Sequence, residues 1–141
     1  MPITTEHVGR SYPPAVPYEV SRAKIAEFAT ALGDDNPRYF GDDPIAPPTF
    51  AAVIAAQAWD SLFGDEELGL ALNRTMHADQ GFDVIRPLVP GDVVLAHLTI
   101  EKVRNRGALD MVTVLVDLRV DGQSVCEARS QLMHTRENEN A

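Results

Sequence analysis

The strongest constraint on the fold is a change of hydrophobic period, from one helical segment to four long strands. Residues 49–62 are apolar on nearly every side, and Ala51, Ala52, Ala55 and Ala56 make the predicted helix slim. A helix that is apolar all round is typical of a core rather than of a surface. The chain then alternates apolar and polar residues, as strands do. The predicted strands are residues 76–84, 93–103, 109–120 and 123–134.

The order of these segments predicts an α+β fold. Sequential strands joined by short turns favour antiparallel pairing, and a curled sheet can bury a helix on its concave side. Asp121-Gly122 is a strong two-residue hairpin signal between the last two strands. We therefore expect an antiparallel sheet wrapped around one long apolar central helix. The free edges of such a sheet favour pairing with a second copy or with a related chain.

The chain of 141 residues is expected to form a single domain, because it is too short for two ordinary cores. Residues 1–17 are rich in proline and should be extended. Ser21 is a typical N-cap and Gly33 a typical helix-ending glycine, so the pattern predicts a surface helix over residues 21–32. Residues 135–141 are predicted to be a frayed tail.

Composition and charge exclude several classes of function. Hydrophobic residues make up 45% of the chain and charged residues 23%, as in soluble globular proteins. The formal net charge of −9 argues against binding of nucleic acid duplexes, which need a basic surface. No apolar run approaches the roughly 18–20 residues of a membrane span, and no secretory signal is recognised. The lone cysteine, Cys126, fits a reducing compartment, so we expect a cytoplasmic protein with neither nucleic acid nor a membrane as partner.

Four short motifs resemble those of one enzyme family. They are Gly33-Asp34-x-Asn36-Pro37, Ala46-Pro47-Pro48-Thr49-Phe50, His77-x-Asp79-Gln80-x-Phe82 and Arg86-Pro87-Leu88-x-x-Gly91-Asp92. Across roughly residues 5–134 the chain resembles the MaoC-like hot-dog dehydratases. Within them it is most similar to the N-terminal-type, or A subunit-type, domain of (3R)-hydroxyacyl thioester dehydratases, small subunits that pair with a catalytic partner. The resemblance implies the hot-dog fold, a dimeric unit and an acyl-thioester tunnel beside the central helix.

The catalytic motif of that family is incomplete in this chain. Catalytic members carry Asp-x-Asn-Pro-x-His; Asp34 and Asn36 match, whereas Tyr39 stands where the histidine belongs. Dehydration needs a group that moves protons near pH 7, and histidine, with a reference pKa of about 6.5, suits this better than tyrosine, near about 10. The resemblance therefore implies a chain that does not dehydrate alone. Simpler interpretations stay open, in which Asp34 is a turn residue and Tyr39 is a half-buried aromatic or a hydrogen-bond donor to substrate.

Further candidate residues lie on the predicted helix and on the first long strand. The resemblance implies substrate contacts at Thr49, Phe50, Val53, His77 and Gln80. His77 and Asp79 should share one strand face about 7 Å apart, with a hydrogen-bonded strand histidine as the simpler alternative. A metal site needs three or four ligands, so we expect neither a metal nor another cofactor. No activating base is placed beside Cys126 by the sequence, which argues against a cysteine nucleophile.

The C-terminal part of the chain is less acidic than the rest and carries one basic cluster. Lys102, Arg104 and Arg106 are the candidate contact for an acidic acyl carrier protein or for the phosphates of coenzyme A. A solvated strand end is the alternative. Three functions stay open: the substrate-holding subunit of a heterodimeric dehydratase for acyl-carrier or acyl-CoA substrates in fatty-acid-type metabolism, a stand-alone homodimeric hydratase that uses Asp34, and a non-enzymatic acyl-thioester binding protein.

Overall fold

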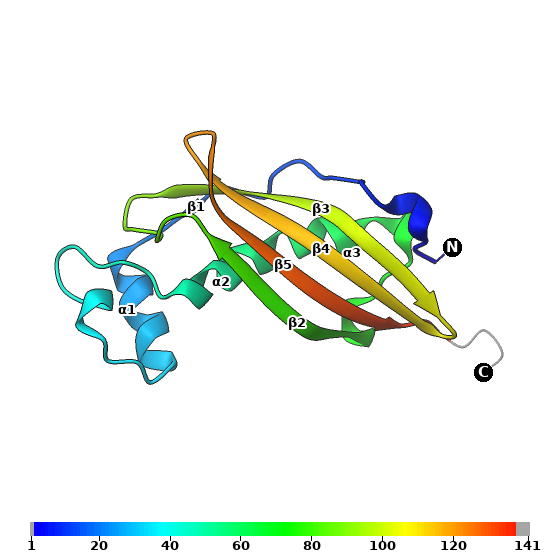
Figure 1. Cartoon of the computed structure of the whole chain (residues 1–141), viewed down its shortest axis with the longest axis horizontal. Helices are drawn as coiled ribbons and strands as arrows, with labels where there is room; N and C mark the ends of the chain where they lie inside the picture. Colours follow the sequence, from blue (N-terminus) through cyan, green and yellow to red (C-terminus); the bar gives the residue numbers. More distant parts are fainter. Residues whose placement is uncertain (1, 138–141) are drawn as a thin grey trace.

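The computed structural model describes residues 2–137 and has the predicted α+β architecture. Five antiparallel strands form one curled sheet in the order β1-β3-β4-β5-β2 (Figure 1). The strands are β1 (Tyr18–Glu19), β2 (Thr75–Val84), β3 (Val93–Arg106), β4 (Leu109–Val120) and β5 (Gln123–Thr135). The helices are α1 (Arg22–Ala31), α2 (Ala51–Gln57) and α3 (Trp59–Gly64). Within residues 2–137, no helix combines the length and the apolar character that crossing a bilayer requires.

Alternation of apolar and polar residues sets the buried face of each long strand. In β4 the side chains of Val112, Val114, Val116 and Leu118 are all 0% exposed, as their shared face predicts. The turn to β5 has positive φ at both central residues, 51° at Asp121 and 78° at Gly122. Positive φ at both positions is what a type I′ turn requires, and Val120 pairs with Gln123, so the two-residue hairpin prediction is confirmed.

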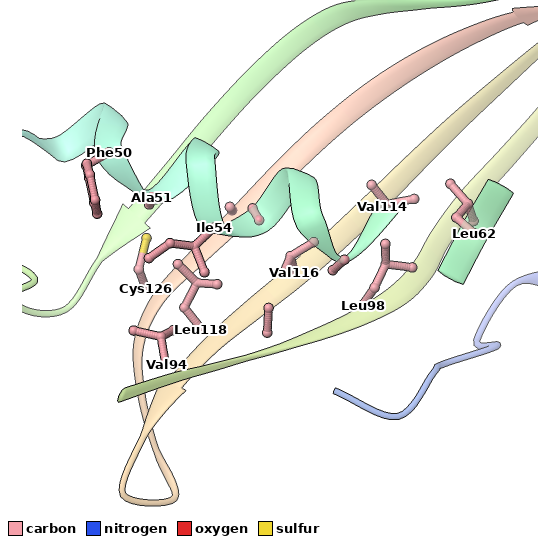
Figure 2. Close-up of a cluster of buried hydrophobic side chains, with 14 of the residues drawn as sticks. Phe50, Ala51, Ile54, Leu62, Val94, Leu98, Val114, Val116, Leu118 and Cys126 are labelled. Atoms are coloured by element: carbon pink, nitrogen blue, oxygen red, sulfur yellow. The ribbon is translucent and has the colours of Figure 1, made fainter. Parts of the chain in front are cut away.

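The central helical segment corrects the prediction of one long apolar helix. A 3-10 turn at Pro48–Phe50 leads into α2, and Ala58 separates α2 from α3. One side packs on the sheet, where Ile54 and Leu62 are buried against its inner face (Figure 2). The opposite side is exposed at Ala56, Gln57 and Asp60. Because an alanine is apolar but small, the sequence did not reveal which side of the helix the sheet leaves uncovered.

The surface helix and its ends agree with the sequence pattern. The hydroxyl of Ser21 accepts the Lys24 backbone N–H at 3.1 Å, which caps α1. Gly33 has a φ of 71°, the left-handed conformation that ends many helices. The helix buries only Ile25 and Ala29, so it lies on the core rather than within it.

The N-terminal segment covers the β3 edge of the sheet. The backbone N–H of Gly9 donates to the Ile100 carbonyl at 2.8 Å, and that of Tyr12 donates to the Leu98 carbonyl at 3.2 Å. The segment contains one 3-10 turn, at Thr5–His7. Its backbone groups therefore occupy part of an edge that would otherwise be open to another strand.

The β2 edge is open. Among residues 2–137, the ten-residue strand β2 pairs with β5 on one side and with no strand on the other. Met76 is 70% exposed, Val84 47% and Ile85 66%. An edge of this length with exposed apolar side chains is a typical site for pairing with another chain.

A buried polar cluster holds the end of the sheet farthest from α1. His134 is 2% exposed and Asp110 is 1% exposed, and His134 Nδ1 lies 3.2 Å from Asp110 Oδ2. The Ala71 N–H donates to His134 Nε2 at 3.2 Å, so the ring proton is on Nδ1 and is donated to Asp110. Asn105 Nδ2 donates to Asp110 Oδ1 at 2.7 Å and to the Ile3 carbonyl at 2.9 Å. These bonds tie the N-terminal segment and the loop before β2 to the sheet.

The predicted tail begins later than expected. β5 continues through Thr135, and the Arg136 N–H donates to the Ala108 carbonyl at 2.8 Å. Residues 138–141, which make up most of the predicted frayed tail, lie outside the described residues.

Candidate functional site

A pocket of about 180 Å³ opens beside the start of α2. The segment from Asn36 to Pro48, the end of β2 and the residues that follow β2 enclose it. Its lining residues are Asn36, Arg38, Tyr39, Ile45, Ala46, Pro47, Pro48, Ala51, Val84, Arg86, Pro87, Leu88 and Cys126. Three of the four motifs from the sequence thus meet at one place, although they are separated by tens of residues in the chain.

The Asp-x-Asn-Pro segment is a pair of side-chain-capped turns. Asp34 Oδ1 accepts the Asn36 N–H at 3.0 Å, and Asn36 Oδ1 accepts the Arg38 N–H at 3.0 Å. Asn36 and Tyr39 line the pocket, whereas Asp34 is exposed and outside the lining. The structure therefore does not bring Asp34 and Tyr39 together in one cavity. Asp34 occupies the turn position that local chemistry favours for aspartate.

The wall of the pocket opposite that segment is fixed by an ion pair. Arg86 donates two hydrogen bonds to Asp92, at 2.8 and 3.1 Å, and Asp92 Oδ2 also accepts the Val89 N–H at 2.9 Å. Although burial opposes ionisation, the bonds from Arg86 and from the Val89 N–H lower the pKa of Asp92. The Arg86-to-Asp92 motif is thus a loop closed by side-chain hydrogen bonds, and it holds Pro87 and Leu88 against the cavity.

His77 and Asp79 do not share a strand face, which corrects the sequence prediction. His77 pairs with Leu132 and Asp79 with the adjacent Gln131, so Ala78 is an extra, bulged residue in β2. One inserted residue reverses the alternation, which turns His77 toward the helices and Asp79 to the outer face of the sheet. Strand spacing alone cannot reveal such a bulge.

His77 is the exposed end of a short hydrogen-bonded chain. His77 Nε2 lies 3.0 Å from Gln80 Oε1, which also accepts the hydroxyl of the buried Ser130 at 2.5 Å. Because Gln80 Oε1 is the acceptor, His77 Nε2 carries a proton. The ring of Trp59 on α3 meets the His77 ring edge-to-face, with centroids 5.0 Å apart. This cluster lies along the open β2 edge, away from the pocket.

The other predicted substrate contacts differ in how far they are exposed to solvent. Phe50 is 0% exposed and lies between Tyr18 and Phe28, with ring centroids 6.2 and 5.3 Å away. It is a core residue, and its role as a substrate contact stays a prediction. Thr49 is exposed and Val53 is half-buried, so both remain accessible beside the start of the central helical segment.

The basic cluster Lys102, Arg104 and Arg106 is exposed near the end of β3 and lies far from the pocket. Arg106 pairs with Leu109 of β4, whereas Cys126, which lines the pocket, pairs with Leu118 of β4. Nine residues of β4 separate these two positions, about 30 Å along the strand, and Lys102, which pairs with Thr113, is about 17 Å away by the same measure. One small anion therefore cannot contact both the basic cluster and the pocket.

Two arginines and the cysteine of the pocket lining were not predicted as site residues. Arg38 follows the Asp-x-Asn-Pro motif directly, and this adjacency was the one signal in the sequence that could have identified it. Burial, followed by nearby carboxylates, raises the pKa of Cys126 to about 11, so its thiol stays neutral at physiological pH. Among residues 2–137, no three His, Cys, Asp or Glu side chains gather as a metal site would require.

A second hollow, of about 600 Å³, lies on the outer face of the sheet beside the N-terminal segment. Two of its charged groups are engaged with each other, since Arg119 Nε donates to Asp117 at 2.6 Å, and Ser124 donates to the other oxygen of Asp117 at 2.5 Å. The smaller pocket beside α2 is therefore the better candidate site, because it combines an apolar interior with exposed polar groups.

Comparison with known proteins identifies the family of this chain. The chain matches the family described as FAS1-like, dehydratase domain region, over residues 6–128. It is 54% identical over 142 residues to UPF0336 protein PPA1896 of Cutibacterium acnes, with 100% of both chains covered. It is 39% identical over 136 residues to UPF0336 protein SCO4636 of Streptomyces coelicolor, covering 89% of this chain and 91% of the relative.

Solved structures show the same fold. A chain of the HadBC (3R)-hydroxyacyl-ACP dehydratase complex from Mycobacterium tuberculosis superposes with a TM-score of 0.82 at 27% identity, covering 93% of this chain and 99% of that one. The R-hydratase PhaJ1 from Pseudomonas aeruginosa gives a TM-score of 0.70 at 17% identity, covering 92% and 83% of the two chains. Sequence and fold together show that this chain belongs to the FAS1-like dehydratase region family, within the MaoC-like hot-dog dehydratases.

Proposed function

We propose that this chain is the substrate-holding, A-type subunit of a (3R)-hydroxyacyl thioester dehydratase and depends on a catalytic partner. The observation that carries the proposal is the composition of the pocket, whose lining holds Tyr39 at the motif position and contains no histidine, aspartate or glutamate. Dehydration removes a proton from the carbon next to the thioester and expels hydroxide, so it needs a group that accepts and returns a proton near pH 7. Phenols and guanidinium groups are poor proton acceptors at that pH.

The open β2 edge supports a hot-dog chain as the partner. Two edge strands related by a two-fold axis run antiparallel, so the partner's equivalent of the pocket would lie near the His77 end of β2. A catalytic Asp and His from the partner would then face His77, Gln80 and Trp59 of this chain. Among the solved structures of the same fold, HadBC and ChsH1–ChsH2, both from Mycobacterium tuberculosis, are complexes of two different chains.

The exposed side of the central helical segment would contact the acyl chain of the substrate. Val53 and Ala56 offer a narrow apolar surface beside β2, and Thr49 lies at its start. Burial of a methylene group against such a surface stabilises a complex by about 0.8 kcal/mol, so a longer acyl chain should bind more tightly. The carrier would be an acyl carrier protein, which would dock on Lys102, Arg104 and Arg106, or coenzyme A. The subunit would act in the cytoplasm, in fatty-acid-type metabolism.

The test is hydration of an enoyl thioester by the purified chain, alone and with a hot-dog partner that carries Asp-x-Asn-Pro-x-His. We expect no turnover by the chain alone and turnover once the partner is added. Loss of that turnover when the partner's motif histidine is replaced assigns the proton transfer to the partner. Robust turnover by the single chain would contradict the proposal and would favour a homodimeric hydratase. Binding of acyl thioesters without turnover with any such partner would favour a non-enzymatic binding protein.

A further inference from the structure

The polar groups at the mouth of the pocket are mainly unengaged hydrogen-bond donors. Asn36 and Arg38 are exposed and Tyr39 is half-buried, so these three side chains form the rim. The acceptor oxygen of Asn36 is already bonded to the Arg38 N–H, which leaves its amide NH₂ free to donate. Within residues 2–137, neither the Arg38 guanidinium nor the Tyr39 hydroxyl has a hydrogen-bond partner. A rim of donors selects a ligand group that is rich in acceptor oxygens.

Charge at the pocket is opposite in sign to that of the protein as a whole. The chain has a formal net charge of −9, yet the charged residues of the pocket lining are both arginines, Arg38 and Arg86. Arg86 is neutralised by its paired hydrogen bonds to Asp92. The positive charge of Arg38 is not balanced by an ion pair with any described residue, so the rim favours one anionic group.

The interior of the pocket is apolar and small. Ala46, Ala51, Leu88 and Cys126 are buried there, and Figure 2 shows Cys126 directly below Ala51 at the start of α2. The volume is about 180 Å³. An apolar cavity of about 150 Å³ holds a molecule the size of benzene, so this pocket admits a compact apolar group and not a long acyl chain.

We propose that Arg38, assisted by Asn36 and Tyr39, binds the phosphate of 4′-phosphopantetheine, and that the adjacent apolar pocket takes the gem-dimethyl group of the same arm. This inference rests on the proposed function, because phosphopantetheine is the part that acyl carrier proteins and coenzyme A share. In phosphopantetheine the phosphate ester and the carbon with two methyl groups are separated by one methylene. The compound therefore carries an anion and a compact apolar group side by side, which matches the rim and the interior of the pocket.

The inference assigns the phosphate to a different place from the basic cluster near the end of β3. Because about 17 to 30 Å of strand separate the residues of that cluster from the pocket, one phosphate group cannot contact both. Arg38 and Lys24 each carry one positive charge on an exposed residue, and Lys24 lies on α1 outside the pocket lining, so they form a matched pair for substitution. Replacing either by glutamine changes the net charge of the chain by the same amount, so long-range electrostatic effects cancel in the comparison.

The test measures binding of 4′-phosphopantetheine and of neutral pantetheine to the full chain by calorimetry. We expect the phosphorylated compound to bind at least about tenfold more tightly, because a charge-assisted hydrogen bond contributes that much. Arg38→Gln should abolish this difference and leave pantetheine binding unchanged, and Arg38→Lys should restore part of it. Lys24→Gln should have no effect. The Arg38-dependent difference should also shrink as salt is raised.

Coenzyme A and a phosphopantetheinylated carrier protein distinguish the two sources of the group. If both compounds lose affinity in Arg38→Gln, the chain recognises the arm that they share. If only one of them loses affinity, that compound is the source of the bound phosphopantetheine. Adenosine 3′,5′-bisphosphate should not compete, since it lacks the arm. Equal binding of phosphopantetheine and pantetheine, or full phosphopantetheine affinity in Arg38→Gln, would overturn the inference. Binding of dodecanoyl-pantetheine in that case would leave the proposed function standing, whereas failure to bind any acyl thioester would count against both.

Discussion

Replacement of Asp92 by alanine should lower the free energy of unfolding by about 2–3 kcal/mol, because it removes the hydrogen bonds that hold the pocket wall together. Asp92 accepts two hydrogen bonds from Arg86 and one from the Val89 N–H. Hydrogen bonds to a charged group contribute about 1.5–3 kcal/mol, and a buried donor left without a partner adds about 1 kcal/mol or more. The Arg86 side chain is 41% exposed and that of Asp92 is 10% exposed, so the ion-pair part is reduced by solvent screening. The loss of stability expected for Asp92→Ala is therefore about 2–3 kcal/mol, less than the sum of the separate hydrogen-bond energies.

The charge of Asp92 makes this effect depend on pH. Asp92→Asn keeps an acceptor for the Val89 N–H but removes the negative charge that faces Arg86. Burial opposes ionisation, but the bonds from Arg86 and Val89 lower the pKa of Asp92 in the folded state. A carboxyl whose folded pKa is depressed stabilises the fold above its unfolded pKa, about 3.9, and this contribution is lost as pH falls through the folded pKa. The difference between wild type and Asp92→Asn should thus be full at pH 7 and should narrow below about pH 4.

The assay is denaturant unfolding at one fixed protein concentration, because association would otherwise shift the midpoint. Asp79→Asn is the matched control, since Asp79 is exposed and forms no ion pair within residues 2–137. The control should change stability by less than about 0.5 kcal/mol. A similarly small effect of Asp92→Ala at pH 7, or an effect of Asp92→Asn that is constant between pH 7 and pH 3, would refute the reasoning.

Three further predictions concern the core, the cysteine and the N-terminal segment. Ile54→Ala should lower the free energy of unfolding by about 2–5 kcal/mol in the same assay, because Ile54 is 1% exposed between α2 and the sheet; an unchanged midpoint would contradict that placement. Cys126 should resist a thiol-specific reagent at pH 8 until denaturant is added, since burial raises its pKa to about 11, and fast reaction with the native protein would contradict it. Burial and then the bond to Asp65 raise the pKa of Tyr12, so Asp65→Asn should lower that pKa in an absorbance titration. An unchanged titration curve would mean that Asp65 contributes nothing to the shift.

Much of the fold could be predicted because the signals were local. The alternation in β4 and the Asp121-Gly122 turn depend on residues two or fewer apart, and both are confirmed. The Ser21 cap of α1 also depends on a contact only three residues along the chain. The site was predicted less completely, because it forms between distant segments. Arg38 and Arg86 meet at the pocket although many residues separate them, and no periodicity in the sequence links them.

The sequence by itself determined which residues are apolar, where strands alternate and where turns form, because these depend on neighbouring side chains and backbone sterics. The resemblance to the dehydratase family adds the expectation that Tyr39 stands where catalytic members carry a histidine. Only the tertiary structure decided which face each of these residues presents. One bulged residue at Ala78 moves His77 and Asp79 to opposite sides of β2, and the position of the sheet leaves one side of α2 uncovered. Strand register and helix orientation are fixed by packing against distant segments, and those contacts form only when the whole chain is folded.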